Sequence, residues 1–164
     1  MRDLPTRKHP RLKNWSYNSN GAYSLTLCVQ DRHEMLGKVV GRGIPDAPHV
    51  ELTEYGKNVM NAIEFMNGRN PGIFIDKYTV MPNHVHLIVT INISDGASGK
   101  PRPTNMAIPK LISSIKRFTN KQAGFNMWQD SYHDHIIRDE AEYQRIWQYI
   151  DCNPERWNED EFYT

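Results

Sequence analysis

The chain has 164 residues and a formal net charge of +1, which predicts one domain, residues 1–164, with a substantial hydrophobic core. Its N-terminus lacks the apolar stretch of a signal peptide, and no apolar run is long enough to cross a bilayer, so we expect no membrane association. The two cysteines lie far apart, which favours reduced thiols in a bacterial cytoplasm over a disulfide framework.

The two ends of the chain carry opposite charge. Residues 1–20 form a basic arm, and residues 155–164 form an acidic, aromatic tail. A basic arm can contact phosphates, although a solvated terminus explains the same composition. For the tail three alternatives stand: it covers a functional site, it covers an apolar face, or it is disordered.

The first half of the chain predicts three strands and one helix. Residues 22–30 alternate apolar and polar side chains, which is typical of a half-buried strand. Residues 37–50 are rich in glycine and proline and predict a loop or a small β-ribbon. Residues 52–66 repeat apolar residues at steps of three and four, which predicts an amphipathic helix. Two further strands follow over 72–81 and 84–91, close enough in sequence to form a hairpin.

The second half predicts two helices around a short strand. A helix begins near Pro109, after a flexible connection over residues 94–105, and basic residues flank its apolar stripe. Residues 132–137 predict a fourth strand, and residues 139–152 predict a last helix that Pro154 ends.

The predicted order of elements is β-α-β-β-α-β-α, without an internal repeat. Its first six elements match the split βαβ, ferredoxin-like motif. We therefore expect an α+β fold with an antiparallel sheet and an extra C-terminal helix. Because this fold serves many functions, the function has to be argued from a site.

Two pairs of histidines stand one residue apart in predicted strands. His84 and His86 open one strand, and His133 and His135 lie in another. Residues i and i+2 of a strand project from the same face, so either pair can bind one divalent cation, and all four together can bind zinc. The simpler alternative is polar histidines on a solvent-facing sheet edge. The spacing alone does not decide among these possibilities.

The last predicted helix adds two polar residues. Tyr149 and Asn153 are four residues apart and share a face that is not the apolar stripe. A metal held by His84, His86 and the Asn153 amide, with Tyr149 as the nucleophile, is a chemically coherent site. A half-buried amphipathic side chain is the commoner fate of a helical tyrosine.

Three segments stand out as a set: "MPNHVHLIV", "SIKRFTNKQ" and "WQDSYHDHIIRDEAEYQRIWQYIDCNP". They resemble the REP-associated tyrosine transposases, a branch of the single-tyrosine HUH transposases of bacterial insertion sequences. The resemblance implies that the metal-binding pair is His84 and His86, that the tyrosine is Tyr149 on the last helix, and that the third ligand is Asn153. The other two histidines match no catalytic position of the family.

The resemblance also implies a reaction. The enzyme would bind single-stranded DNA beside a hairpin or palindromic repeat, and Mg²⁺ or Mn²⁺ would orient the scissile phosphate. Tyr149 would attack that phosphate, giving a 5′-phosphotyrosine and a free 3′-OH. The 3′-OH of another strand can attack in reverse, so cutting and joining need no ATP. Arg145, one turn before Tyr149, is expected to stabilise the phenolate, to contact a phosphate or to be a surface charge.

DNA binding would use the basic arm and the helix that begins near Pro109. The basic residues concerned are Arg7, Lys8, Arg11, Lys13, Lys110, Lys116, Arg117 and Lys121. Trp15, Tyr17 and Trp128 are expected either to stack on unpaired bases or to pack in the core. The protein would work at the nucleoid as a monomer or a homodimer. The main alternative is a catalytically silent DNA-binding protein, and a four-histidine zinc protein is a weaker one.

Overall fold

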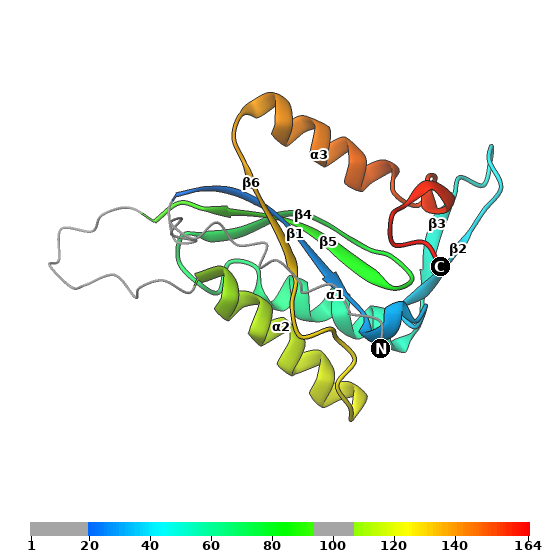
Figure 1. Ribbon diagram of the computed structural model, residues 1–164, viewed down its shortest axis with the longest axis horizontal. Helices are drawn as coiled ribbons and strands as arrows, with labels where there is room; N and C mark the ends of the chain where they lie inside the picture. The colour runs from blue at the N-terminus through cyan, green and yellow to red at the C-terminus, as the bar shows by residue number, and fades with distance from the viewer. Residues whose placement is uncertain (1–19, 94–106) are drawn as a thin grey trace, which may run out of the picture.

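The computed structural model describes residues 20–93 and 107–164 (Figure 1). The predicted connection over 94–105 and the basic arm, apart from residue 20, lie outside the described residues. The strands are β1 Gly21–Cys28, β2 Gly37–Val40, β3 His49–Leu52, β4 Ile73–Val80, β5 His84–Ile91 and β6 His133–Ile137. The helices are α1 Glu54–Met66, α2 Ala107–Ala123 and α3 Glu140–Cys152, and short 3-10 turns span Gln30–Arg32 and Trp157–Glu159.

Four strands form one sheet in the order β4-β5-β1-β6, and every neighbouring pair in it is antiparallel. The strands that α1 connects, β1 and β4, are separated by β5. The strands that α2 connects, β5 and β6, are separated by β1. These two crossovers give the split βαβ arrangement, so the predicted α+β, ferredoxin-like fold with an extra C-terminal helix is confirmed. The glycine- and proline-rich segment forms the separate β2-β3 ribbon.

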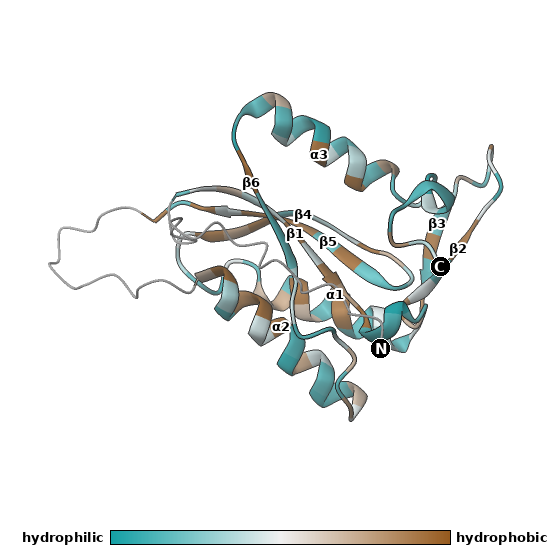
Figure 2. Cartoon of the chain, in the orientation of Figure 1, coloured by the Kyte–Doolittle hydropathy of each residue, from teal (hydrophilic) through white to brown (hydrophobic). Residues whose placement is uncertain are grey.

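The helices cover both faces of the sheet. α1 and α2 lie on one face and α3 lies on the other (Figure 1). The larger core fills the α1 and α2 side, where alternate residues of the two central strands are buried: Tyr23, Leu25, Leu27, Val85, Leu87 and Val89. A smaller cluster on the α3 side joins Ile88, Ile137 and Ile150. Because this cluster is small, α3 needs only a narrow apolar stripe, and Figure 2 shows it as mostly hydrophilic.

Polar contacts hold α3 in place over the sheet. Asp139 caps its first turn by accepting a hydrogen bond from the backbone N–H of Glu142 at 2.8 Å. The Tyr143 hydroxyl donates to Asp76 of β4 at 3.0 Å. Lys77, the next residue of β4, forms an ion pair with Asp151 near the end of the helix. Both ends of α3 are therefore tied to the same strand, which fixes the face that it presents to β5.

The chain reverses direction after α3. Asn153 still has helical backbone angles, and the turn at Trp157–Glu159 then brings the acidic tail back over the start of β5. Trp157, Asp160 and Phe162 are buried there. Three alternatives were expected for the tail, and in the structure the tail covers the histidine pair of β5. Within the described ranges, none of the helices has both the length and the apolarity to cross a bilayer.

Candidate metal and tyrosine site

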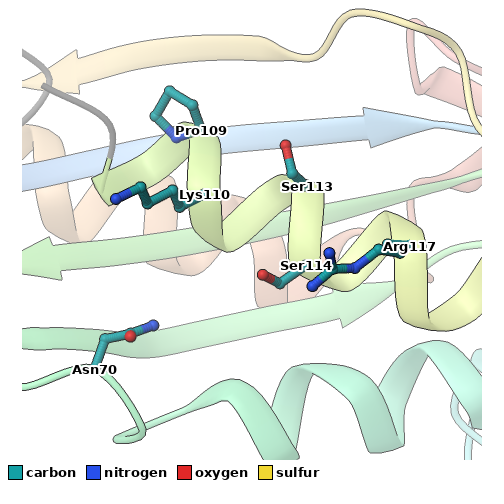
Figure 3. A pocket seen from close by; sticks show the side chains of 6 residues that line it. All are labelled: Asn70, Pro109, Lys110, Ser113, Ser114 and Arg117. Carbon is teal, nitrogen blue, oxygen red and sulfur yellow. The ribbon is translucent and has the colours of Figure 1, made fainter.

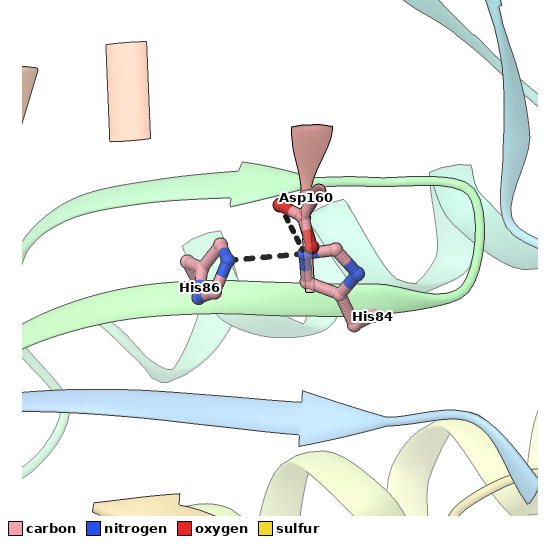
Figure 4. Close-up of side chains that lie close together, drawn as sticks. All are labelled: His84, His86 and Asp160. Atoms are coloured by element: carbon pink, nitrogen blue, oxygen red, sulfur yellow. Dashed lines mark hydrogen bonds and ion pairs between the residues drawn. The ribbon is translucent and has the colours of Figure 1, made fainter. Parts of the chain in front are cut away.

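His84 and His86 lie at the start of β5, on the face of the sheet that α3 and the tail cover. Their exposed fractions are 0% and 4%. Their side chains point to the same side of the strand, and their Nε2 atoms lie 3.0 Å apart (Figure 4). Burial of two imidazoles against each other is costly unless their nitrogens have partners, so the partners decide what the pair can do.

The outer nitrogen of each imidazole has a hydrogen-bond partner. His84 Nδ1 lies 2.8 Å from the Oδ1 of Asn83. The Asn83 Nδ2 donates to the backbone oxygens of Arg32 and Phe162, which fixes the orientation of its amide. Because an amide oxygen only accepts, His84 carries its proton on Nδ1 and keeps a lone pair on Nε2. His86 Nδ1 lies 2.8 Å from the Thr26 hydroxyl. The Thr26 hydroxyl can accept or donate, so it suits both tautomers of His86. With its proton on Nε2, His86 donates to His84 Nε2 at 3.0 Å, and with its proton on Nδ1, both Nε2 lone pairs are available to a cation.

Both histidines are neutral at physiological pH. Burial is the main cause that lowers the pKa of His84 from 6.5 to about 2, and the neighbouring His86 and Arg32 lower it further. Burial likewise lowers the pKa of His86 to about 4, although the Asp160 carboxylate opposes the shift. Neutral imidazoles with an inward lone pair are the form that binds metal ions.

α3 brings Tyr149 and Asn153 to the same place. The Tyr149 ring centre lies 5.4 Å from that of His86, and 41% of the residue is exposed. Asn153 is buried, with 1% exposed. Its Nδ2 donates to Asp160 at 2.8 Å. Its Oδ1 is buried and has no hydrogen-bond partner among the described residues. A buried amide oxygen without a donor is suited to bind a cation.

Asp160 is the residue of this site that sequence reasoning missed. Its Oδ2 accepts hydrogen bonds from the Tyr149 hydroxyl at 3.1 Å and from Asn153, and it lies 3.8 Å from His84 Nε2. Within the described chain, His84, His86 and Asp160 form the one group of three or more metal-binding side chains, with ligand atoms within 4.8 Å of one another. The tail contains four acids at 155, 159, 160 and 161, and no spacing in the sequence distinguishes one of them.

Aromatic rings of the tail cover the histidine pair. The ring centre of Phe162 lies 4.6 Å from that of His84 and 5.9 Å from that of His86. The ring centre of Trp157 lies 5.9 Å from that of His84. These rings exclude water and strengthen the electrostatic interactions at the site.

The surroundings of Tyr149 oppose its ionisation. Burial is the first cause that raises its pKa from 10.0 to about 12, and the charge and the hydrogen bond of Asp160 raise it further. A divalent cation at the histidine pair would have the opposite effect on the phenol, because a positive charge favours the phenolate.

The donors fit a hard divalent ion. Two ligands at right angles on an ion with bonds of roughly 2.1 Å are about 3 Å apart, and the two Nε2 atoms are separated by 3.0 Å. Two imidazoles with oxygen donors suit Mn²⁺ or Mg²⁺, with imidazole favouring Mn²⁺. The residues expected from the sequence, His84, His86 and Asn153, therefore have the donor atoms that such an ion requires.

Arg145 is exposed on α3, and neither a hydrogen bond nor an ion pair joins it to Tyr149 or to any other described residue. The structure therefore does not support the expectation that it stabilises the phenolate. The other two expectations for Arg145, a phosphate contact and a surface charge, stay predictions.

The basic residues of α2 differ in their surroundings. Lys116 donates to the backbone oxygens of Gln129 at 2.7 Å and Ser131 at 3.2 Å, so it anchors the segment before β6 and is not a free DNA contact. Lys110 and Arg117 line an open pocket of about 380 Å³ together with Asn70, Ser113 and Ser114 (Figure 3). Lys121 is exposed.

The other expected DNA contacts are of two kinds. The arm residues Arg7, Lys8, Arg11 and Lys13, and the aromatic residues Trp15 and Tyr17, lie outside the described residues. Trp128 belongs to the core instead. It is buried, and its indole N–H donates to Thr119 at 2.8 Å, so of the two alternatives expected for Trp128 the structure shows packing in the core.

The second histidine pair is not part of the metal-binding group, although the ring centre of His133 lies 5.8 Å from that of Phe162. His133 lies across β1 from His86, because Thr26 pairs with both residues. His135 is partly exposed and contacts Glu142 of α3 at 2.7 Å. Neither residue belongs to the metal-binding group of His84, so the described chain contains no four-histidine site.

The comparisons with known proteins agree with the fold. No protein-family model matches the chain. A protein of Haemophilus influenzae, described only as uncharacterized, is 29% identical to this chain over an alignment 176 residues long. The alignment covers 96% of this chain and 93% of that protein. A solved structure of a REP-associated tyrosine transposase bound to a REP hairpin matches 90% of this chain and 73% of its own, with a TM-score of 0.61 and 21% identity. The chain has the fold of a REP-associated tyrosine transposase. The resemblance seen in the sequence is thus confirmed at the level of the fold.

Proposed function

We propose that this protein is a REP-associated tyrosine transposase that nicks and joins single-stranded DNA through a covalent tyrosine intermediate. The observation that carries the proposal is that β5 and α3 bring their polar side chains to one site. β5 contributes two neutral, buried imidazoles, and α3 contributes both a tyrosine hydroxyl and an amide oxygen without a donor. A metal site beside an accessible phenol is what phosphoryl transfer to tyrosine requires.

The proposed metal ligands are His84 Nε2, His86 Nε2 and Asn153 Oδ1. When bound, Mg²⁺ or Mn²⁺ would draw negative charge from the scissile phosphate and hold it in place. Asn83 and Thr26 would keep the imidazoles in position through their Nδ1 atoms.

In the proposed reaction the Tyr149 oxygen forms a bond to the phosphorus of the scissile phosphate. The bond from phosphorus to the 3′-oxygen breaks, and the phenolic proton ends on that oxygen. The products are a 5′-phosphotyrosine and a 3′-OH. The 3′-OH of another strand reverses the step, since a phosphate ester replaces a phosphate ester and no bond energy is lost.

The proposed substrate is single-stranded DNA beside a hairpin or palindromic repeat. The related structure was solved with a REP hairpin, which supports this choice. Lys110, Arg117, Lys121 and the arm residues would contact phosphates, and Arg145 on the exposed side of α3 would contact the phosphate near Tyr149. The protein would act as a monomer or a homodimer on DNA in the cytoplasm.

A catalytically silent DNA-binding protein is the second proposal, and one observation favours it. The Tyr149 hydroxyl donates a hydrogen bond to the Asp160 carboxylate, which opposes ionisation of the phenol, and the Phe162 ring lies close to both imidazoles. A site that is covered in this way is the expected state of a relative that keeps the fold and has lost the chemistry.

A covalent-adduct assay separates the two proposals. Labelled single-stranded DNA from palindromic repeats beside the gene is incubated with protein and Mn²⁺, then run on a denaturing gel. A shifted band that is lost with Tyr149→Phe and with EDTA supports strand transfer. A shift on native gels without a covalent band, across several such repeats, supports the silent DNA-binding protein.

A further inference from the structure

We propose that Asp160 is itself a ligand of the divalent ion, so that the C-terminal tail is part of the metal site. This inference rests on the proposed function, because it adds a carboxylate to the ion that His84, His86 and Asn153 would hold. It concerns a residue that no sequence motif of the chain singles out.

The position of the carboxylate is the first argument. The side chains of His84 and Asp160 are both fully buried, and Asp160 Oδ2 lies 3.8 Å from His84 Nε2 (Figure 4). The ligand atoms of His84, His86 and Asp160 lie within 4.8 Å of one another. Two ligands on opposite sides of one ion with bonds of roughly 2.1 Å would be about 4 Å apart. A small adjustment of the side chains therefore places all three atoms around one ion.

The charge of Asp160 is the second argument. A carboxylate that is removed from water needs hydrogen bonds and a positive partner. Its oxygens accept from the backbone N–H of Phe162 at 2.7 Å, from Asn153 and from Tyr149, and all three donors are uncharged. Among the described residues its one ion-pairing neighbour is His84, whose Nε2 lies 3.8 Å from Asp160 Oδ2, too far for a hydrogen bond. A divalent ion would supply the missing positive charge.

The neighbouring acids of the tail provide the contrast. Glu159 and Glu161 are exposed, and Glu159 forms an ion pair with Arg156 at the surface. They have the same charge as Asp160 and nearly the same position in the chain, but they do not face the histidines. A long-range effect of acidic charge on metal binding would be shared by all three residues, whereas ligation belongs to Asp160 alone.

The proposal has a thermodynamic consequence. If Asp160 binds the ion, metal binding and docking of the tail stabilise each other by the same free energy. Mn²⁺ should therefore slow the removal of C-terminal residues by a carboxypeptidase in the wild-type protein. With Asp160→Asn the same ion should give no protection.

The first experiment is a calorimetric titration of the full-length, DNA-free protein with Mn²⁺. We expect Asp160→Asn to weaken Mn²⁺ binding by about ten-fold or more, since even groups that only support a ligand change affinity by roughly that factor. The matched control is Glu161→Gln, which removes the same charge one residue later and should leave the affinity nearly unchanged. Circular dichroism of each variant confirms that it is folded.

The second experiment changes the type of ligand. Asp160→Cys places a thiolate in the site, and a thiolate ligand prefers Cd²⁺ to Mn²⁺. We expect this variant to gain affinity for Cd²⁺ relative to Mn²⁺, while Glu161→Cys does not. A sulfur-to-cadmium absorption band in the ultraviolet would report the bond directly. A residue that only holds the tail in place would produce neither result.

The outcomes separate this inference from the proposed function. If the wild-type protein binds Mn²⁺, His84→Ala abolishes the binding and Asp160→Asn leaves it unchanged, then Asp160 is not a ligand and the metal site of the proposed function stands. If the folded wild-type protein binds neither Mn²⁺ nor Mg²⁺, both proposals are wrong. A loss with Asp160→Asn, no loss with Glu161→Gln and a Cd²⁺ preference with Asp160→Cys support the inference.

Discussion

The Tyr149 hydroxyl donates a hydrogen bond to the Asp160 carboxylate at 3.1 Å, so the proposed nucleophile on α3 is in direct contact with the C-terminal tail. Eleven positions of chain separate the two residues. The contact exists because the chain turns back after α3. It places a carboxylate, whose charge opposes ionisation of the phenol, beside the hydroxyl that the proposed reaction would ionise.

Replacement of Tyr149 by phenylalanine should abolish the covalent adduct while the protein remains folded. The variant loses one hydrogen bond at a partly exposed position, which costs about 1 kcal/mol of folding free energy. Denaturing gels with labelled DNA measure the adduct, and native gels measure binding. An adduct that persists in Tyr149→Phe would show that another residue is the nucleophile.

Metal ions should stabilise the protein through the first histidine pair and not the second. An ion present at about 100 times its dissociation constant adds roughly 2.7 kcal/mol to the free energy of unfolding. We expect His84→Ala and His86→Ala to lose the increase in melting temperature that Mn²⁺ produces. His135→Ala is the control, because that residue contacts Glu142 outside the site. Loss of the effect in His135→Ala would instead favour a site that includes all four histidines.

The metal-free protein should lose stability as the pH falls below about 6.5. The folded-state pKa values of His84 and His86 are about 2 and about 4, against 6.5 for an exposed histidine. Below that pH the unfolded chain takes up protons that the folded chain does not, which costs about 2 kcal/mol per histidine near pH ~5. Urea unfolding at several pH values measures the effect, and His86→Gln should make the dependence shallower. Equal slopes in the two proteins would contradict the buried neutral state of His86.

Lys116 should be needed for stability more than for DNA binding. Its ammonium group holds the backbone oxygens of the segment before β6, and hydrogen bonds from a charged donor contribute about 2 kcal/mol. Lys116→Met should therefore lower the midpoint of urea unfolding. The control is Lys121→Met on the same helix, an exposed residue whose replacement should have little effect on unfolding. Similar midpoints for the two variants would show that the Lys116 contacts add nothing.

Arg117 should contribute to DNA binding through phosphate contacts. It lines the open pocket with Lys110 on the outer side of α2. Arg117→Ala should weaken binding of different hairpin sequences equally and reduce the slope of log affinity against log salt by about 1. Titrations at several salt concentrations measure that slope. An unchanged slope would place the DNA away from this helix.

Much of the fold was predictable because the periodic patterns are strong. The alternation in β1 and the three- and four-residue steps in α1 identify those elements, and β5 begins at His84 as predicted. The spacing of the histidines could not select between the two pairs. What separates them is the sheet: β5 has a neighbour on each side and lies beneath the tail, whereas β6 is an edge strand with exposed histidines.

The parts of the site that could not be predicted depend on where distant segments meet. Asp160 reaches His84 only because the chain reverses after Asn153, and no local pattern specifies that reversal. In the sequence, Lys116 looks like any basic residue on the exposed face of a helix. Its hydrogen bonds to three backbone oxygens depend on the path that the chain takes before β6. Local periodicity contains no information about the contact of Asp160 with His84 or about the contacts of Lys116 with the backbone before β6.

The register of the β1-β5 pair has a consequence for folding. His84 lies opposite Cys28 and His86 opposite Thr26, and neighbouring residues of a strand point to opposite faces of the sheet. A slip of one residue would turn Val85 toward the tail and push both imidazoles into the core beneath α1 and α2. A chain that pairs its strands wrongly would therefore lack the proposed metal site as well as a stable core. The same strand register is therefore required for the core and for the proposed site.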